Sequence, residues 1–260
     1  MKSTRVMRDS SCPTLSVVVP VHNEAKNLAS LIEHISKSLE RVDHEIIYVN
    51  DGSTDSSRKE LERLASKFAT LRVFHHRTSC GQSRAVVTGV RQARAELIAT
   101  LDGDGQNDPA DLPRLLEAFQ VAADPALAMI IGNRASRRDT AWRRFSSRFA
   151  AMVRAKMLRD HTPDSGCGIK MFRREVFLEL PNFNHMHRYL PVLFRNNGYS
   201  VQSMEVNHLD RWHGRSNYGT VDRLLNGLSD VLGVMWLTRR TNVPEIEGEV
   251  SERATAKEDR

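Results

Sequence analysis

The stretch HEIIYVNDGSTDSS, residues 44–57, shows a pattern that recurs through the first half of the chain. The segment His44–Asn50 is rich in β-branched and aromatic residues and predicts a buried strand. Asp51 and Gly52 interrupt the apolar run, and the residues that follow are of the types that cap helices. A helical pattern then extends over residues 54–69. The stretch therefore predicts a strand, a tight turn and a helix in succession.

The same alternation appears on both sides of this stretch. Strands are predicted at residues 15–20, 71–76, 96–102 and 127–132, and helices at residues 25–41, 81–95 and 110–122. Near-continuous apolar strands that alternate with helices are typical of a mainly parallel sheet covered on both faces. We therefore expect an α/β fold, a Rossmann-like domain of three layers.

Polar residues follow three of these strands at the point where each strand ends. The strand ends read PVHNE, VNDGSTD and LDGDGQ, and ligands of such sheets bind at the carboxyl ends of the strands. Gly52 and Gly103 lie in the turns and would let the backbone approach a ligand closely. Three polar strand ends on one edge predict a binding site there.

The third strand end carries two carboxylates, Asp102 and Asp104, separated by one glycine. Like charges this close cost free energy unless a cation or a set of hydrogen-bond donors offsets them. Mg²⁺ and Mn²⁺ prefer oxygen ligands, and the amide of Gln106 would supply a third. Such an ion would neutralise charge on a leaving diphosphate. The alternative is an acidic surface loop without an ion.

The other two strand ends permit two interpretations. Asp51 could accept hydrogen bonds from a base or a ribose, while Ser53 and its neighbours could simply form a turn and a helix cap. Glu24 could contact the same nucleotide, or it could be an acidic first-turn residue that favours the helix dipole. Neither motif identifies a ligand by itself.

Composition limits the class of protein. The chain has 260 residues, of which 40% are apolar and 27% charged, as expected for one globular domain with an appendage. The net charge of +6 predicts an acidic partner, which could be nucleic acid, nucleotide phosphates or an anionic membrane. Residues 134–160 hold nine Arg or Lys against two Asp. This segment is either a phosphate- or membrane-facing surface or a solvated basic helix.

Three cysteines without metal-ligand spacing predict a reducing compartment. No apolar segment has the character of a signal peptide or the length of a membrane span. We therefore expect a cytoplasmic protein, peripheral on the cytoplasmic face of the inner membrane.

The second half of the chain is less regular. Helices are predicted near residues 142–158 and 187–197, a strand entering a helix within 164–177, and a strand near 200–208. We expect residues 1–14 to be an extension, 15–219 the main folded domain, 220–240 an amphipathic helix and 241–260 a disordered tail. In the helix, Trp236 and Arg239–Arg240 suit an in-plane position at a membrane interface. Packing on the core or in a dimer is the alternative.

Four segments together carry a family resemblance: LSVVVPVHNEAKNL, HEIIYVNDGSTDSS, GQSRAVVTGVRQARAELIATLDGDGQNDPADLPRLL and IIGNR. In order and spacing they resemble the catalytic domain of inverting family 2 glycosyltransferases, which have the GT-A fold. The motifs NDP, GNR, DSGCGIKMFRREV and RWHGRSNYG are most similar to the polyprenyl-phosphate glycosyltransferases of the dolichol-phosphate mannose synthase type.

The resemblance implies a role for individual residues. The residues expected to contact the nucleotide sugar are Pro20, Val21, Glu24, Asp51, Ser53, Asp102, Gly103 and Asp104. The expected metal ligands are Asp102, Asp104 and Gln106. The residues expected to contact the acceptor phosphate are Arg134, Arg143 and Ser147. The catalytic set is Asp102, Asp104, Arg134 and Arg211, the last of which would close over the diphosphate. It further implies Mg²⁺ or Mn²⁺ as cofactor, with a nucleotide-sugar donor and a polyprenyl phosphate acceptor. Other expected partners are a membrane surface and a separate membrane subunit or a second copy of the chain.

Two departures from the family pattern bear on specificity. The subgroup usually has Ser-Lys where this chain has Ser216-Asn217, so a positive charge is lost. Several relatives continue into transmembrane helices, whereas Leu224–Leu237 is too short to span a bilayer. The donor would be GDP-mannose by subgroup, but residues 182–199 look more like bacterial envelope-modifying enzymes, which favours a UDP-sugar.

Other functions remain as alternatives. The chain could be a family 2 transferase for a carbohydrate or lipid hydroxyl, or a non-catalytic nucleotide-sugar-binding module. We expect no nucleic-acid partner, because no nucleic-acid-binding module is recognisable. A nucleotidyltransferase would need a glycine-rich basic loop near the first strand, and none is found.

Overall fold

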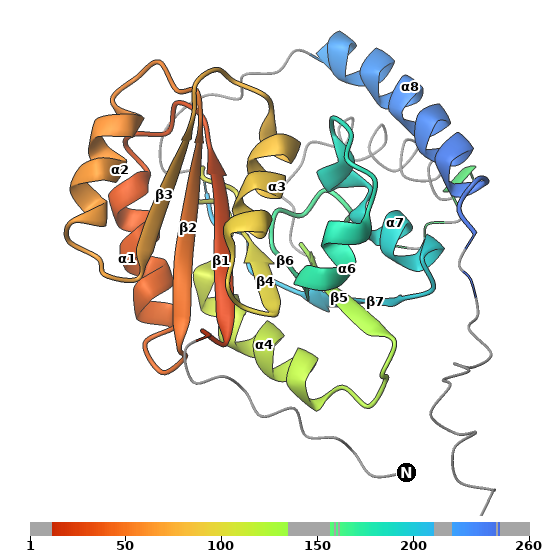
Figure 1. Ribbon diagram of the computed structural model, residues 1–260, viewed down its shortest axis with the longest axis horizontal. Helices are drawn as coiled ribbons and strands as arrows, with labels where there is room; N and C mark the ends of the chain where they lie inside the picture. The colour runs from red at the N-terminus through yellow and green to blue at the C-terminus, as the bar shows by residue number, and fades with distance from the viewer. Residues whose placement is uncertain are drawn as a thin grey trace, which may run out of the picture.

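The computed structural model describes residues 12–134, 157–158, 160, 162–210, 220–242 and 244, with the backbone alone for residues 220–228. Within these residues, a single sheet of seven strands forms the centre of the structure (Figure 1). The strands are β1 Leu15–Val21, β2 His44–Asp51, β3 Leu71–His76, β4 Leu97–Thr100, β5 Leu127–Asn133, β6 Lys170–Arg173 and β7 Ser200–Glu205. Their order across the sheet is β3-β2-β1-β4-β6-β5-β7.

The sheet is mainly parallel, which confirms the prediction. β6 is antiparallel to both of its neighbours, β4 and β5, and every other adjacent pair is parallel. The predicted strand within residues 164–177 is therefore present, but its place between β4 and β5 was not predicted. That insertion brings Lys170 opposite Thr100, next to the end of the strand that precedes the paired aspartates.

Helices cover both faces of the sheet, so the domain has three layers (Figure 1). On one face lie α1 Leu28–Ser38, α2 Ser57–Ala65 and α4 Leu112–Val121; on the other lie α3 Gln82–Gln92, α6 Arg174–Glu179 and α7 Leu190–Asn196. The alternation of side chains along a strand explains the two layers. Val17 and Val19 join the first apolar cluster, and Val18 joins the second. Short 3-10 helices, η1 Pro109–Asp111 and η2 Met186–Arg188, precede α4 and α7.

The elements around the polar strand ends are shorter than predicted, because side-chain hydrogen bonds form turns there. Asn23 has a φ of 58° and its Oδ1 accepts from the backbone N–H of Thr54 at 2.8 Å, so α1 begins at Leu28 and not at residue 25. β4 ends at Thr100, and the N–H of Asp102 donates to Asn107 Oδ1 at 2.8 Å instead of continuing the strand.

The long C-terminal helix, α8 Thr220–Thr238, lies beside η2 and α7 (Figure 1). Val234 is buried against Tyr189 and Val192. On the outer side of the helix, Leu232 is 46% and Trp236 60% exposed. None of the helices among the described residues is long and apolar enough to cross a membrane.

Candidate active site

Three neighbouring strands bring the polar strand ends to one edge of the sheet. β1 lies between β2 and β4 and is parallel to both, so their carboxyl ends meet. Gly103, in the turn after β4, packs closely against the end of β1. A Cβ at this position would lie 2.5 Å from Val21 Cγ1 and 3.0 Å from the Pro20 carbonyl. Only glycine therefore lets the turn with the two aspartates pack against the end of β1.

Protein groups hold Asp102 on three sides. Its N–H donates to Asn107 Oδ1 at 2.8 Å, and its Oδ1 accepts from Gln82 Nε2 at 2.9 Å. Gly168 lies against the other carboxylate oxygen, since a Cβ there would come within 2.2 Å of Oδ2. Burial, and then the negative charge of Asp104, raise the pKa of Asp102 above its ordinary value. A bound cation would relieve both effects.

Asp104 lies two residues further along the same turn. Its Oδ1 accepts from the backbone N–H of Gln106 at 3.1 Å. The backbone carbonyl of Gln106 accepts from the N–H of Leu209 at 3.0 Å, so this turn also contacts the segment that follows β7. Of the three residues predicted to hold a metal, the two carboxylates share the turn. The hydrogen bond from Gln106 to Asp104 comes from the backbone N–H, so coordination of a metal by the side-chain amide of Gln106 stays a prediction.

Two cations flank the paired aspartates. Arg134 donates from Nε to Asp164 Oδ2 at 2.6 Å and from Nη2 to Oδ1 at 2.8 Å, and both side chains are mostly buried. The buried ammonium of Lys170 donates to the carbonyl of Cys167. Burial lowers the pKa of Lys170, while the charge of Asp102 partly opposes that effect.

These ionisable groups suit a divalent ion. The three carboxyl groups of Asp102, Asp104 and Asp164 lie among two basic side chains, Arg134 and Lys170, so acidic groups outnumber basic ones in this cluster. Carboxylate oxygens are the ligands that Mg²⁺ and Mn²⁺ prefer. The paired aspartates, with the raised pKa of Asp102, therefore fit such an ion.

Asp51, for which we predict a nucleotide contact, accepts four hydrogen bonds from the protein. It is 3% exposed, and its Oδ1 accepts from His76 Nδ1 at 2.7 Å and from the N–H of Cys80 at 2.8 Å. Its Oδ2 accepts from Ser79 Oγ and from the N–H of Gly81, both at 2.8 Å. Burial opposes ionisation, but these hydrogen bonds together lower the pKa of Asp51. The nucleotide contact of Asp51 stays a prediction.

Of the remaining predicted nucleotide contacts, Pro20 and Val21 end β1, and Glu24 and Ser53 lie in the adjoining turns. The N–H of Asn23 donates to Ser53 Oγ at 2.9 Å, and Asn27 Nδ2 donates to Glu24 Oε2 at 2.6 Å. Asp55 Oδ1 accepts from the N–H of Ser57 at 2.9 Å at the start of α2. The turn interpretation accounts for the contacts of Ser53. The helix-dipole interpretation of Glu24 is wrong, because α1 begins at Leu28 and has no acidic residue in its first turn. A nucleotide contact of either residue stays a prediction.

Three predicted residues, Arg143, Ser147 and Arg211, lie outside the described residues. The segment before Arg211 is described up to Asp210. In this segment, His208 forms a β-bridge with Asn107 beside the paired-aspartate turn.

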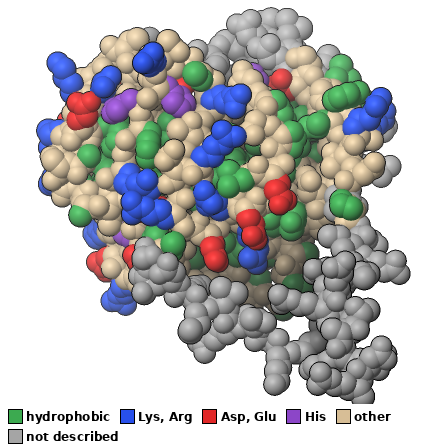
Figure 2. Space-filling model, viewed as in Figure 1, with side chains coloured by type: hydrophobic (Ala, Val, Ile, Leu, Met, Phe, Trp, Pro, Cys, Tyr) green, Lys and Arg blue, Asp and Glu red, His purple; other side chains and the backbone are tan. Residues whose placement is uncertain are grey.

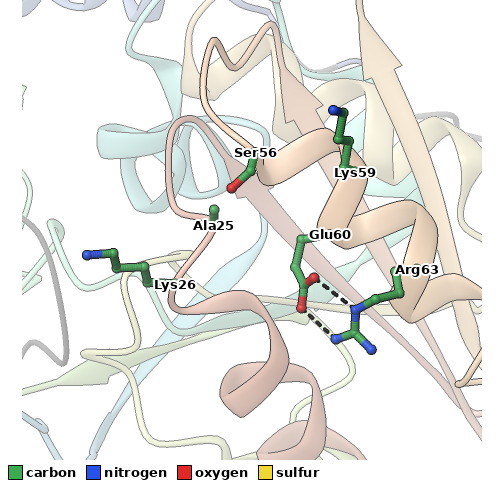
Figure 3. A pocket seen from close by; sticks show the side chains of 6 residues that line it. All are labelled: Ala25, Lys26, Ser56, Lys59, Glu60 and Arg63. Carbon is green, nitrogen blue, oxygen red and sulfur yellow. Dashed lines mark hydrogen bonds and ion pairs between the residues drawn. The ribbon is translucent and has the colours of Figure 1, made fainter.

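A pocket of about 320 Å³ lies apart from the paired aspartates, between the start of α1 and helix α2 (Figure 3). Its lining residues are Ala25, Lys26, Ser56, Lys59, Glu60 and Arg63. Glu60 and Arg63 form an ion pair within it. No residue of the predicted catalytic set lines this pocket.

Sequence reasoning missed three residues of the site: Gln82, Asp164 and Lys170. Each contacts or faces a residue far away in the chain, so no local spacing marks it. The one available signal was the presence of Gln82 and of DSGCGIK within the segments that carry the family resemblance.

Comparison with known proteins identifies the family of this chain. The model of the family "Glycosyl transferase family 2" matches residues 16–180, more than half of the chain. The chain belongs to glycosyl transferase family 2.

Among curated relatives, it is 31% identical over 231 residues to the dodecaprenyl-phosphate galacturonate synthase of Rhizobium johnstonii, covering 86% of this chain and 67% of the relative. It is 34% identical over 232 residues to the undecaprenyl-phosphate 4-deoxy-4-formamido-L-arabinose transferase of Pseudomonas paraeruginosa, covering 86% and 66%.

Solved structures show the GT-A fold of this family 2 member. The mannosyltransferase of Pyrobaculum calidifontis, in complex with GDP-Man and Mn²⁺, is similar with a TM-score of 0.64 at 18% identity, covering 90% of this chain and 67% of that one. The glucosyl-3-phosphoglycerate synthase of Mycobacterium tuberculosis, in complex with Mg²⁺ and UDP, has a TM-score of 0.65 at 18% identity, covering 90% and 81%. At these identities the likeness shows the fold alone. The chain spans about two thirds of the length of the curated relatives that it matches.

Proposed function

We propose that this chain transfers a sugar from a nucleotide-diphosphate sugar to a polyprenyl phosphate, with inversion at the anomeric carbon and with Mg²⁺ or Mn²⁺ as cofactor. The observation that carries the proposal is the charge cluster at the edge of the sheet. Asp102 and Asp104 lie on one turn, with the cations of Arg134 and Lys170 beside them. The acceptor class is supported by the names of the relatives, which transfer sugars to dodecaprenyl or undecaprenyl phosphate.

The chemistry of the acceptor explains why such a site needs no general base. The second pKa of a phosphate monoester is about 6, so a prenyl phosphate is largely dianionic at neutral pH and can attack the anomeric carbon directly. Catalysis then depends on aligning two anions and on stabilising the departing nucleoside diphosphate. When bound, the divalent ion would neutralise charge on that leaving group.

The residues of the chain have separate tasks in this scheme. Asp102 and Asp104 would hold the ion. Arg134, fixed by Asp164, would present its guanidinium to a phosphate oxygen of the donor or the acceptor. In-line attack on an α-linked donor would yield a β-linked prenyl phosphosugar.

The proposed donor sugar is inferred from the names of the relatives and not from the geometry of the site. Galacturonate and 4-deoxy-4-formamido-arabinose are the sugars in the relatives' names. UDP-linked uronic acids and aminosugars are therefore the first donors to test, with GDP-mannose beside them.

A transfer assay tests the proposal. Purified protein, a short polyprenyl phosphate and Mn²⁺ or Mg²⁺ are incubated with a panel of labelled UDP- and GDP-sugars, and label is counted in the organic phase. We expect metal-dependent extraction with one donor. If a donor is bound and slowly hydrolysed but no lipid is labelled, a carbohydrate or lipid hydroxyl becomes the acceptor to test.

Variants separate the chemistry from folding. Asp102→Asn and Asp104→Asn remove one charge each while keeping the shape of the side chain, and each should abolish transfer while the thermal unfolding of the protein stays cooperative. Glu60→Gln, in the ion pair of the pocket in Figure 3, is a matched control and should keep full activity. A folded Asp104→Asn protein with near-normal turnover would exclude the metal assignment.

We further propose that helix α8 binds the surface of the membrane that contains the acceptor, on its cytoplasmic face. Hydrophobic and basic side chains lie together over the C-terminal half of α8 (Figure 2). Leu232 and Trp236 are exposed there, and the Arg240 guanidinium lies over the Trp236 ring at 5.7 Å from its centroid. An exposed Trp on the helix and an exposed Arg shortly after its end favour an interface of lipid headgroups.

Vesicle flotation tests this contact. The protein should float with vesicles that contain anionic lipid, and Trp236→Ser should weaken flotation severalfold. Val121, at the end of α4, is 74% exposed, so Val121→Ser removes a comparable exposed apolar side chain elsewhere and should have no effect. Equal flotation of both variants would contradict the proposal.

A further inference from the structure

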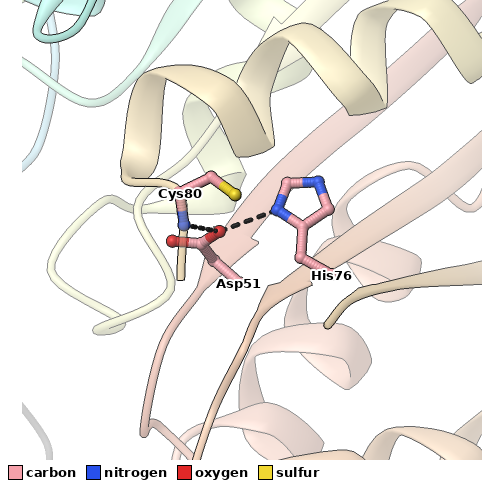
Figure 4. Close-up of side chains that lie close together, drawn as sticks. All are labelled: Asp51, His76 and Cys80. Carbon is pink, nitrogen blue, oxygen red and sulfur yellow. Dashed lines mark hydrogen bonds and ion pairs between the residues drawn. The ribbon is translucent and has the colours of Figure 1, made fainter. Parts of the chain in front are cut away.

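Three side chains at the ends of β2 and β3 bring different metal-binding atoms together. A carboxylate oxygen of Asp51, a ring nitrogen of His76 and the thiol sulfur of Cys80 all lie within 4.8 Å of one another. Figure 4 shows the Cys80 thiol and the His76 ring beside one another near the Asp51 carboxylate. We propose that these residues bind Zn²⁺ at a second site, distinct from the paired aspartates, and that Zn²⁺ bound there lowers the transferase activity. The activity part of this inference rests on the proposed function.

The donor set discriminates between metal ions. Thiolate and imidazole ligands favour Zn²⁺, whereas Mg²⁺ and Mn²⁺ prefer oxygen ligands such as those of Asp102 and Asp104. The two sites would therefore select different ions by chemistry. Three protein ligands would leave the fourth tetrahedral position of Zn²⁺ to water.

The geometry requires only small movements. In a tetrahedral zinc site, bond lengths of about 2.0–2.3 Å place neighbouring ligand atoms roughly 3.3–3.6 Å apart. His76 Nδ1 and Asp51 Oδ1 are 2.7 Å apart and would have to separate slightly. The sulfur lies within 4.8 Å of the other two ligand atoms and would exchange its contact with the Thr78 carbonyl, now at 3.4 Å, for the metal. Cys80 is exposed, so an ion can reach its thiol.

The other nitrogen of the His76 ring is already oriented. Nε2 lies 2.9 Å from Thr88 Oγ1, a hydroxyl that can either donate or accept. A carboxylate can only accept, so Nδ1 is the donor in the bond to Asp51, and in a neutral ring Nε2 would then accept from Thr88. On metal binding the imidazole would shift its proton to Nε2 and donate to Thr88, which leaves Nδ1 free to coordinate. The thiol of Cys80 would release one proton as the metal–sulfur bond forms.

Occupation of this site would affect the catalytic turn through one short loop. The carboxylate of Asp51 holds the loop by accepting from the N–H groups of Cys80 and Gly81, and the next residue, Gln82, donates to Asp102. Zn²⁺ would compete with these donors for the carboxylate. We therefore expect the loop to shift and the hydrogen bond to Asp102 to weaken.

Metal binding is tested first, without any assay of activity. Co²⁺ is titrated into the full chain, because Co²⁺ replaces Zn²⁺ in such sites and its thiolate complexes absorb light. We expect a thiolate-to-metal absorption that Zn²⁺ displaces, lost in Cys80→Ser and in His76→Gln. Cys12→Ser, which removes another exposed cysteine, should leave it intact, and Cys167 is unchanged in all of these proteins. No absorption in the wild type, or an equal one in Cys80→Ser, would overturn the site.

Inhibition is tested second, at saturating Mn²⁺. Zn²⁺ should inhibit the wild type at concentrations at least tenfold lower than it inhibits Cys80→Ser, whose activity without Zn²⁺ should be normal. Equal inhibition would overturn the link to the loop. Failure of the proposed transfer reaction would leave the Co²⁺ titration unaffected, so the two proposals can fail separately.

Discussion

Arg134 and Asp164 form a bidentate ion pair, with Nε to Oδ2 at 2.6 Å and Nη2 to Oδ1 at 2.8 Å, although 30 residues separate them in the chain. Their side chains are only 10% and 15% exposed. The guanidinium that we expect to approach a phosphate is therefore held by the protein before any ligand binds. A fixed orientation of this kind lowers the reorganisation needed in the reaction.

Removing one partner of this pair should be costly. Asp164→Ala leaves a mostly buried guanidinium without its carboxylate, and we expect a loss of about 3–5 kcal/mol in the free energy of unfolding, together with loss of transfer. Denaturant titration measures the first effect. The control is Glu60→Ala, which breaks the more exposed pair with Arg63 and should cost much less stability, because solvent screens that pair. Similar losses for the two variants would contradict this expectation.

The Gln82 side chain should affect the metal requirement. Hydrogen bonds to charged groups contribute about 1.5–3 kcal/mol, so Gln82→Ala should raise the Mn²⁺ concentration for half-maximal activity by roughly tenfold or more. Gln92→Ala, at the exposed other end of α3, should leave the metal titration unchanged. A normal titration of Gln82→Ala would mean that Asp102 does not need this donor.

Gly103 should tolerate no side chain. Gly103→Ala places a Cβ 2.5 Å from Val21 Cγ1, so we expect a loss of about 1–3 kcal/mol in stability and a displaced aspartate turn with little activity. Gly233→Ala, in α8, meets no atom within 4 Å and should stabilise the helix by up to about 1 kcal/mol. Thermal unfolding and the transfer assay distinguish the two outcomes.

Acid should destabilise the protein through His187. Burial, and then the charge of Lys170, lower the pKa of His187 well below its ordinary value of 6.5, while its Nδ1 lies 2.7 Å from Ser83 Oγ. In the unfolded chain this residue takes up a proton as the pH falls through 6.5, and in the folded protein it does not. The unfolded state thus binds more protons, and stability falls as the pH decreases below 6.5, by up to about 1.4 kcal/mol per pH unit for this group.

The pH dependence is checked by measuring the free energy of unfolding between pH 7.5 and pH 5. His187→Gln keeps a polar partner for Ser83 but cannot take up a proton in this range. Its stability should therefore fall less steeply with decreasing pH than that of the wild type. Parallel curves would exclude His187 as the source.

Local pattern alone determined the alternating strands and helices and the polar strand ends of this protein. β3 has the predicted bounds, Leu71–His76, and the segment with Asp102 and Asp104 follows a buried strand as expected. Side-chain periodicity and turn residues report such features because they depend on neighbours in the chain. The carboxyl ends of β1, β2 and β4 meet because parallel strands share a direction, which the sequence also implied.

Only the tertiary structure decided which groups these residues meet. Asp51 accepts from four groups of β3 and of the loop before α3, and Gln82 reaches Asp102 across 20 residues. The antiparallel β6 places Lys170 and Gly168 beside the aspartates, because that strand enters between β4 and β5. Hydrogen bonds and charge pairs of this kind depend on distances in space that residue types and spacing do not encode. Sequence could therefore place the two carboxylates at the sheet edge, and the packing of distant segments determined how they are held.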